Sequence, residues 1–241
     1  MNFKVFDTYD EVSVYTAELL AEVVREKEDA VLGLATGSSP VGMYKELIKL
    51  HKDGKLDFSK AKSINLDEYV GLEGSHEQSY RYFMNTNLFD HVNIDKKNTF
   101  VPDGTVDDLA IGAEKYDKLI ESMGGIDVQV LGIGPNGHIG FNEPSDALKM
   151  DTHVAELTEE TIKANARFFE SEKDVPTKAV TMGVGPIMKA KKIILIASGE
   201  NKAWAVKSLT DDVITTMIPA TLLKLHPDVT VVLDKEAASM L

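Results

Sequence analysis

The segment 130–144, VLGIGPNGHIGFNEP, joins an apolar run to a glycine-rich turn that carries side chains able to do acid–base chemistry. Asn136 precedes His138 by two residues and Glu143 follows it by five, so both can orient the imidazole. A histidine held by an amide and a carboxylate is suited to move protons near neutral pH. The alternative is a glycine turn whose histidine is hydrogen-bonded only for structure.

The segment 34–40, LATGSSP, is a second candidate site, between a predicted strand and a predicted helix. Small residues let the backbone N–H groups around Gly37 and the hydroxyls of Ser38 and Ser39 converge on an anion, for which phosphate is the obvious candidate. The alternative is helix capping by Ser38 or Ser39, with Pro40 at the first helical position. The segment matches neither the Walker pattern nor the full dinucleotide fingerprint, so it does not predict a nucleotide.

The segment 65–69, NLDEY, places two adjacent acids at the end of an apolar run. Side chains alternate along an extended backbone, so one of Asp67 and Glu68 faces inward and the other outward. An inward, partly desolvated carboxylate can remove a carbon-bound proton. The alternative is that both carboxylates cap backbone groups or are solvated.

Two basic side chains are candidates for holding a phosphate in this acidic chain. Arg167 lies in the sequence NARFF, and Lys202 follows a predicted strand and a glycine turn. Arginine offers a planar fork of donors and lysine a compact charge. The alternatives are that Arg167 interacts with the C-terminus of its helix and that Lys202 lies on a solvated face.

The hydrophobic pattern predicts a single α/β domain with a mostly parallel sheet. Several apolar runs are nearly continuous, which is typical of parallel strands covered on both faces by helices. The predicted strands are 31–35, 62–66, 128–133, 179–182, 193–197 and 229–233. The predicted helices are 9–27, 41–52, 78–88, 107–123, 159–170, 201–209 and 219–225.

Composition excludes several classes of partner. The net charge is −13 over 241 residues and no basic patch is present, so we expect neither a nucleic-acid nor a membrane partner. The chain has no cysteine, and its six histidines show no i, i+4 pair, so no metal site is predicted. The N-terminus lacks a signal-peptide pattern, and no apolar run approaches bilayer length, so we expect a soluble, cytoplasmic protein.

Five motifs together resemble the glucosamine-6-phosphate deaminase (glucosamine/galactosamine-6-phosphate isomerase) family: LATGSSP, NLDEYVGL, GIGPNGHIGFNEP, NARFF and GENKA. They occur in the family's order, and the similarity runs from the first predicted strand to about Leu233, which is nearly the whole chain. The resemblance implies one Rossmann-like domain over 1–241. It also implies conversion of glucosamine 6-phosphate and water to fructose 6-phosphate and ammonia, in amino-sugar catabolism. Such an enzyme is a hydrolase acting on an amino-sugar phosphate, and it needs no cofactor.

The resemblance also implies roles for individual residues. Asp67 is the base that moves a proton from C2 to C1, and His138 assists ring opening, oriented by Asn136 and Glu143. A lid segment, 156–176, closes over the substrate. The phosphate is held by Gly37, Ser38, Ser39, Arg167 and Lys202.

The sequence departs from the family pattern at two places. Many members have aspartate where Asn136 stands, and asparagine cannot stabilise an imidazolium by charge, which predicts a lower histidine pKa. Allosteric members carry an Arg-x-Lys pair that binds N-acetylglucosamine 6-phosphate, where this chain has His153 and Ala155. We therefore expect no activator site and a monomer or small homo-oligomer.

Two other functions remain open on the same scaffold. One is a 6-phosphogluconolactonase-like hydrolase, and the other is a non-enzymatic protein that senses sugar phosphates. A lactonase needs no proton transfer between C1 and C2, so Asp67 at a strand end favours the deaminase.

Overall fold

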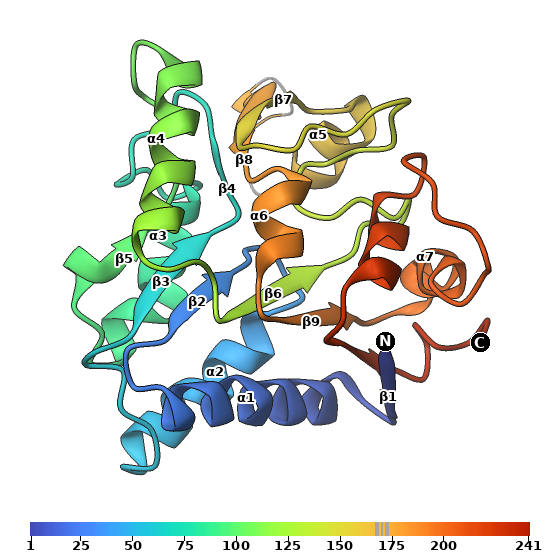
Figure 1. The fold of residues 1–241 in the computed structure, drawn as a ribbon, viewed down its shortest axis with the longest axis horizontal. Helices are drawn as coiled ribbons and strands as arrows, with labels where there is room; N and C mark the ends of the chain where they lie inside the picture. The colour runs from blue at the N-terminus through green and yellow to red at the C-terminus, as the bar shows by residue number, and fades with distance from the viewer. Residues whose placement is uncertain (167–168, 170, 172–173) are drawn as a thin grey trace.

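The computed structural model describes residues 1–166, 169, 171 and 174–241. Its main sheet has seven strands in the order β1-β10-β9-β6-β2-β3-β5, and every neighbouring pair is parallel (Figure 1). The predicted mostly parallel sheet is confirmed. The strands are β1 (Asn2–Phe6), β2 (Val31–Leu34), β3 (Lys62–Asn65), β5 (Thr99–Phe100), β6 (Val128–Gly132), β9 (Lys192–Ala197) and β10 (Val229–Asp234).

Helices cover both faces of this sheet, because alternate residues of each strand enter two different cores. In β2, Val31 belongs to one core and Leu32 and Leu34 to the other. The first core is closed by α4 (Leu109–Ser122), α6 (Val184–Lys189) and α7 (Ala203–Ser208). The second core is closed by α1 (Tyr9–Glu26), α2 (Val41–Lys52) and α3 (Tyr80–Asn87), and Figure 1 shows α1 and α2 below the sheet with α6 above it.

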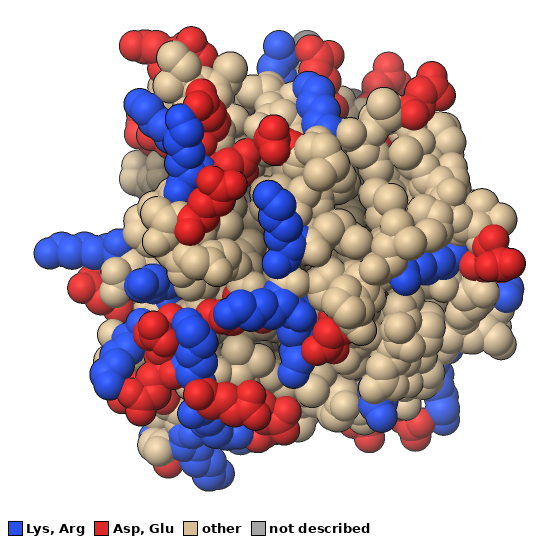
Figure 2. All heavy atoms as spheres, viewed as in Figure 1, with Lys and Arg blue, Asp and Glu red and all other residues tan. Residues whose placement is uncertain are grey.

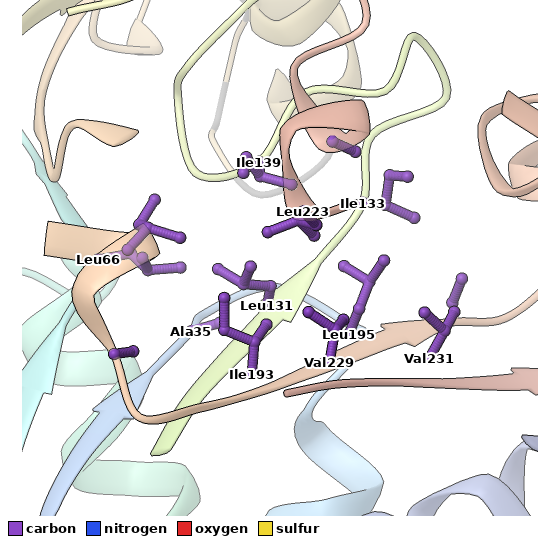
Figure 3. Packing of buried hydrophobic residues seen from close by; sticks show 14 of the residues in the cluster. Ala35, Leu66, Leu131, Ile133, Ile139, Ile193, Leu195, Leu223, Val229 and Val231 are labelled. Atoms are coloured by element: carbon purple, nitrogen blue, oxygen red, sulfur yellow. The ribbon is translucent and has the colours of Figure 1, made fainter. Parts of the chain in front are cut away.

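The first core reaches the carboxyl ends of the central strands. Figure 3 shows Ala35 and Ile133, just beyond β2 and β6, packed together with Leu131, Leu195 and other apolar side chains. These side chains are at most 4% exposed. The loops that follow β2 and β6 therefore begin directly at the tightly packed hydrophobic core.

A second, three-stranded antiparallel sheet has the order β4-β8-β7. Its strands are β4 (Asp67–Tyr69), β7 (His153–Glu156) and β8 (Lys178–Thr181). The strand predicted at 179–182 thus exists, but assigning it to the parallel sheet was wrong. An apolar run shows that a strand is buried, and it does not show which strand is its partner.

Other differences from the sequence prediction are local. The pattern missed α6, whose short span contains Gly185 and Pro186, and the edge strand β1, which is only partly buried. The segment 201–209 divides into a 3-10 turn (Glu200–Lys202) and α7, and 219–225 is a 3-10 helix (Pro219–Leu225). Helix α5 spans Glu159–Asn165, and residues 167–168 and 170 of its predicted extension lie outside the described residues. Two further 3-10 turns are Phe89–His91 and Lys96–Asn98.

The strand order creates a crevice between β2 and β6. After β2 the chain builds β3 and β5 on one side, then returns through α4 to place β6 on the other side. The loops after β2 and β6 therefore diverge at the carboxyl edge of the sheet, where open α/β folds bind ligands.

The surface carries both signs of charge. On the face drawn in Figure 2, basic and acidic side chains are intermixed rather than segregated. No helix in the described part of the chain has the length and apolar character needed to cross a membrane.

Candidate active site

A cavity of about 660 Å³ lies at this crevice and collects most of the predicted site residues. It is bounded by the loops after β2, β6 and β9 and by the start of β4. The predicted residues that line it are Gly37, Ser38, Ser39, Asp67, Asn136, His138 and Lys202. Glu143 lies behind His138, and Arg167 falls outside the described residues.

The loop after β2 presents backbone donors to the cavity. The amide N–H groups of Gly37, Ser38 and Ser39 donate to no acceptor within the part of the chain that the structure describes. Helix α2 begins at Val41 with Pro40 as its N-cap, and no side chain caps it. The capping alternative for the two serines is therefore wrong, and consecutive unpaired amides are suited to bind an anion.

Asp67 opens strand β4 and turns its carboxylate toward the cavity. It is 6% exposed, and no hydrogen bond to its carboxylate is present among the described residues. Burial, together with the neighbouring charge of Glu68, raises the pKa of Asp67 to about 8. Such a carboxyl group can exchange a proton near neutral pH.

Glu68 faces the other way and caps helix α3. Its carboxylate accepts hydrogen bonds from the backbone N–H groups of Tyr69 (2.8 Å), Tyr80 (2.8 Å) and Arg81 (2.9 Å). Burial raises the pKa of Glu68, and these three bonds work against that rise. The alternation predicted for the two acids is present, and the outward one is buried as a cap rather than solvated.

The loop after β6 holds His138 through a network of side chains. Its Nδ1–H donates to a Glu143 carboxylate oxygen at 3.1 Å, since a carboxylate can only accept. The Asn136 amide donates to the same carboxylate at 2.8 Å and accepts the His138 backbone N–H at 3.2 Å. Thr161 donates to the second Glu143 oxygen at 2.9 Å. The imidazole is therefore held at Nδ1.

Glu143 remains ionised in this network. Burial alone raises its pKa, but hydrogen bonds from His138, Asn136 and Thr161 outweigh that effect and hold the pKa below its ordinary value. A charged Glu143 fixes the His138 tautomer and stabilises the imidazolium when it forms.

Gly140 brings the histidine loop against Asp67. Its φ of +57° is in the region that favours glycine, and a Cβ built there would lie 3.8 Å from Asp67 Oδ2 and 3.2 Å from Thr181 Oγ1. Thr181 stands directly opposite Asp67 in the small sheet and accepts the Phe141 N–H at 3.1 Å. The small sheet therefore fixes the distance between Asp67 and the histidine loop.

Lys202 reaches the cavity from the turn after β9. That turn is anchored by Asp234, which accepts hydrogen bonds from the Ser198 hydroxyl and, at 3.1 Å, from the Gly199 N–H.

No group of three His, Cys, Asp or Glu side chains among the described residues could hold a metal ion.

Residues 6–232 match the family model described as glucosamine-6-phosphate isomerases/6-phosphogluconolactonase. The chain belongs to this family. The glucosamine-6-phosphate deaminase of Clostridium perfringens (strain 13 / Type A) is 58% identical over 241 residues, which cover 100% of both chains. The family resemblance carried by the five motifs is confirmed.

Solved structures of the family share the fold. A monomeric glucosamine-6-phosphate deaminase superposes with a TM-score of 0.98 at 46% identity, and the match covers 100% of both chains. The 6-phosphogluconolactonase of Trypanosoma brucei superposes with a TM-score of 0.77 at 21% identity, covering 100% of this chain and 98% of the other. At that identity the second match shows the fold alone.

In this family member, His153 and Ala155 lie on β7, away from the cavity-lining residues. The imidazole Nδ1–H of His153 donates to the Asp151 carbonyl at 2.9 Å. Burial lowers the pKa of His153, so it is neutral at physiological pH.

Sequence reasoning missed three residues that line the cavity: Tyr9, Tyr80 and Thr161. Tyr9 and Tyr80 lie in the first turns of helices α1 and α3, and Thr161 lies in α5. Nothing in their local sequence separates them from ordinary helix residues, because only the packing of these helices around the crevice brings them to the site.

Proposed function

We propose that this chain converts glucosamine 6-phosphate and water to fructose 6-phosphate and ammonia. The observation that carries the proposal is Asp67, a buried carboxyl group with a pKa raised to about 8, in one cavity with the His138 imidazole and the unpaired amides of the loop after β2. This set supplies a base for a carbon-bound proton, a group for ring opening and donors for a phosphate.

Phosphate binding positions the sugar. The amides of Gly37, Ser38 and Ser39, together with Lys202 and Arg167, hold the phosphate at the carboxyl edge of the sheet. The segment 156–176, of which residues 167–168, 170 and 172–173 lie outside the described residues, is proposed to act as a lid over the substrate. Because the phosphate is fixed, the reacting carbons are held against Asp67 and little orientational freedom remains to be lost.

Ring opening is assigned to His138. Its Nδ1–H is bound to Glu143, so Nε2 is the nitrogen that moves a proton between the ring oxygen and the anomeric hydroxyl. Opening the pyranose produces a carbonyl at C1, which acidifies the proton on C2.

Isomerisation and deamination follow at C1 and C2. Asp67 removes the C2 proton to give an enolamine and returns a proton to C1, which leaves a ketimine at C2. Water then adds to the ketimine carbon, the C–N bond breaks, and ammonia and fructose 6-phosphate result. The hydrolase classification expected from the sequence refers to this last step only, and the isomerisation precedes it.

The two other functions are less well supported. Opening a lactone needs no base that shuttles a proton between two carbons, and the buried Asp67 with its raised pKa supports the function that does need one. A sensor of sugar phosphates needs the phosphate loop, but it needs neither Asp67 nor the His138–Glu143 pair.

Incubation of the purified protein with glucosamine 6-phosphate tests the proposal. We expect ammonia and fructose 6-phosphate in equal amounts, and exchange of the C2 proton in deuterated water. A parallel reaction with 6-phosphogluconolactone is the control. Lactone hydrolysis without ammonia release would replace the deaminase by the lactonase.

We also propose that the enzyme acts as a monomer or small homo-oligomer on a small sugar phosphate, without a nucleic-acid partner. The 46% identical relative of known structure is a monomeric enzyme, which supports this assembly. Light scattering at the assay concentration tests it. Cytoplasmic localisation remains a prediction.

A further inference from the structure

Tyr9 braces the loop after β2 with a single hydroxyl group. It is the first residue of α1, and its hydroxyl lies 3.0 Å from both the Ser38 and the Ser39 carbonyl oxygen, which share its single hydrogen. The Tyr9 hydroxyl oxygen accepts the Gly42 N–H at 2.8 Å. One side chain thus joins α1, the loop and the first turn of α2.

The approach of α1 to α2 makes this contact possible. Thr8 and Glu11 form a capping box that fixes the start of α1, and Ser13 donates to the Tyr9 carbonyl at 2.8 Å. A Cβ at Gly42 would lie 2.0 Å from Ser13 Oγ and 3.0 Å from the Tyr9 ring. The absence of a side chain at Gly42 therefore lets Tyr9 reach the loop.

Holding the Ser38 carbonyl also sets the direction of the next amide. A trans peptide is planar with its C=O and N–H antiparallel, so the bond to Tyr9 points the Ser39 N–H away from the tyrosine oxygen. Pro40 has no N–H, and no side chain caps α2. The start of the loop is held by the Tyr44 hydroxyl, which donates to the Ala35 carbonyl at 2.6 Å. Tyr9 adds the restraint at the other end, on the carbonyls of Ser38 and Ser39.

We infer that Tyr9 is a positioning residue whose hydroxyl restrains the Ser38 and Ser39 carbonyls and so holds the Ser39 N–H, beside the amides of Gly37 and Ser38, in the orientation that binds phosphate. The inference rests on the proposed function only for the identity of the sugar attached to the phosphate. Without the hydroxyl, the ring still fills its place beside the cavity, but the Gly42 N–H and the Ser39 carbonyl lose this partner, and the Ser38 carbonyl keeps only the Val41 N–H at 3.4 Å. The loop then samples other peptide orientations, and phosphate affinity falls.

The test compares Tyr9→Phe with Tyr15→Phe, which removes a hydroxyl from the same helix at a residue that does not line the cavity. We expect Tyr9→Phe to raise KM for glucosamine 6-phosphate about tenfold, as expected for the loss of net hydrogen bonding at the loop. Its kcat stays within about twofold of the wild type, because the groups that move protons are untouched. Tyr15→Phe leaves both constants unchanged. A fall in kcat with KM unchanged would overturn the inference.

Titration with inorganic phosphate separates this inference from the proposed function. We expect phosphate to shift the backbone amide resonances of Gly37, Ser38 and Ser39 in the wild type, with an affinity about tenfold weaker in Tyr9→Phe. Equal phosphate affinity in the two proteins, or unshifted loop resonances in the wild type, would overturn the role of Tyr9. Failure to release ammonia, with this phosphate result intact, would overturn only the proposed function.

Discussion

The start of β4 and the loop after β6 each place a carboxylate beside the same cavity, Asp67 buried and Glu143 with a side chain 12% exposed, and the two carboxylates behave oppositely. Asp67 receives no hydrogen bond within the described part of the chain, and its pKa rises to about 8. Glu143 receives hydrogen bonds from three side chains, and its pKa falls below the ordinary value.

This contrast shows that hydrogen-bond donors can offset the effect of burial on the pKa of a carboxylate, as they do for Glu143 but not for Asp67. Both groups lose hydration, which disfavours the charged form, but only Glu143 gains donors that replace the lost water. Pairs of titratable groups whose environments push their pKa values apart mark an acid–base site. Asp67 is therefore suited to exchange a proton, and Glu143 to keep a charge next to His138.

Replacing Asp67 should have the largest effect. Asp67→Asn keeps the shape of the side chain but cannot accept a proton, so turnover should fall by about 10²–10⁴-fold while fructose 6-phosphate still binds. Ammonia release and C2 exchange in deuterated water measure this. Glu68→Gln, which alters the adjacent carboxylate outside the cavity, is the comparison: it keeps the Asp67 carboxyl group and should retain exchange, with the pH profile shifted to lower pH because the Glu68 charge no longer raises the pKa of Asp67. Wild-type exchange in Asp67→Asn would remove Asp67 from the reaction.

Replacing Glu143 should have a smaller effect on turnover. Glu143→Gln removes the charge that orients and stabilises the imidazole, and we expect kcat to fall about 10²-fold, toward the lower end of general acid–base contributions. Thr161→Val, which deletes one donor to Glu143 and leaves the charge, serves as the comparison in steady-state assays. An equal loss in the two variants would mean that the charge is not what matters.

The same contrast predicts a pH-dependent stability. The pKa of Asp67 is 3.8 in the unfolded chain and about 8 in the folded one, so the folded state binds this proton more tightly. The contribution of Asp67 to the free energy of unfolding therefore becomes less favourable as the pH rises from 3.8 to about 8. Asp67→Asn should therefore be more stable than the wild type at pH 8, by on the order of a few kcal/mol, and nearly equal to it at pH 4. Thermal unfolding at both pH values measures the difference. A variant that is less stable at pH 8 would contradict the raised pKa.

The smallest expected effect is that of N-acetylglucosamine 6-phosphate. The residues at the position of the activator-binding pair, His153 and Ala155, offer no positive charge at pH 7.5, because burial lowers the pKa of His153. A ligand shifts an equilibrium only through different contacts with two states. We expect a hyperbolic saturation curve that the effector leaves unchanged at pH 7.5. A sigmoidal curve made hyperbolic by the effector would reveal an activator site elsewhere.

The α/β class and the central strands follow from the local pattern of residues. Near-continuous apolar runs specify strands buried on both faces, and the pattern of β2, β3, β6, β9 and β10 follows from them. The apolar run before Asp67 also predicted that this residue lies at a strand end. Side chains alternate along an extended backbone, so Asp67 and Glu68 were predicted to face opposite ways. The predicted roles of Asp67 and His138 rest on the family motifs and await the assays above.

Which groups meet, and in what protonation state, depends on how distant parts of the chain pack together. Strand order set the crevice between β2 and β6, and antiparallel pairing of β4 with β8 joined residues 67 and 181, which are distant in sequence. The contact of Tyr9 with the loop after β2 depends on the packing of α1 against α2. The opposite pKa shifts of Asp67 and Glu143 depend on which donors surround each carboxylate. Burial and the placement of hydrogen-bond donors arise from contacts between residues far apart in the sequence, so a local residue pattern does not predict them.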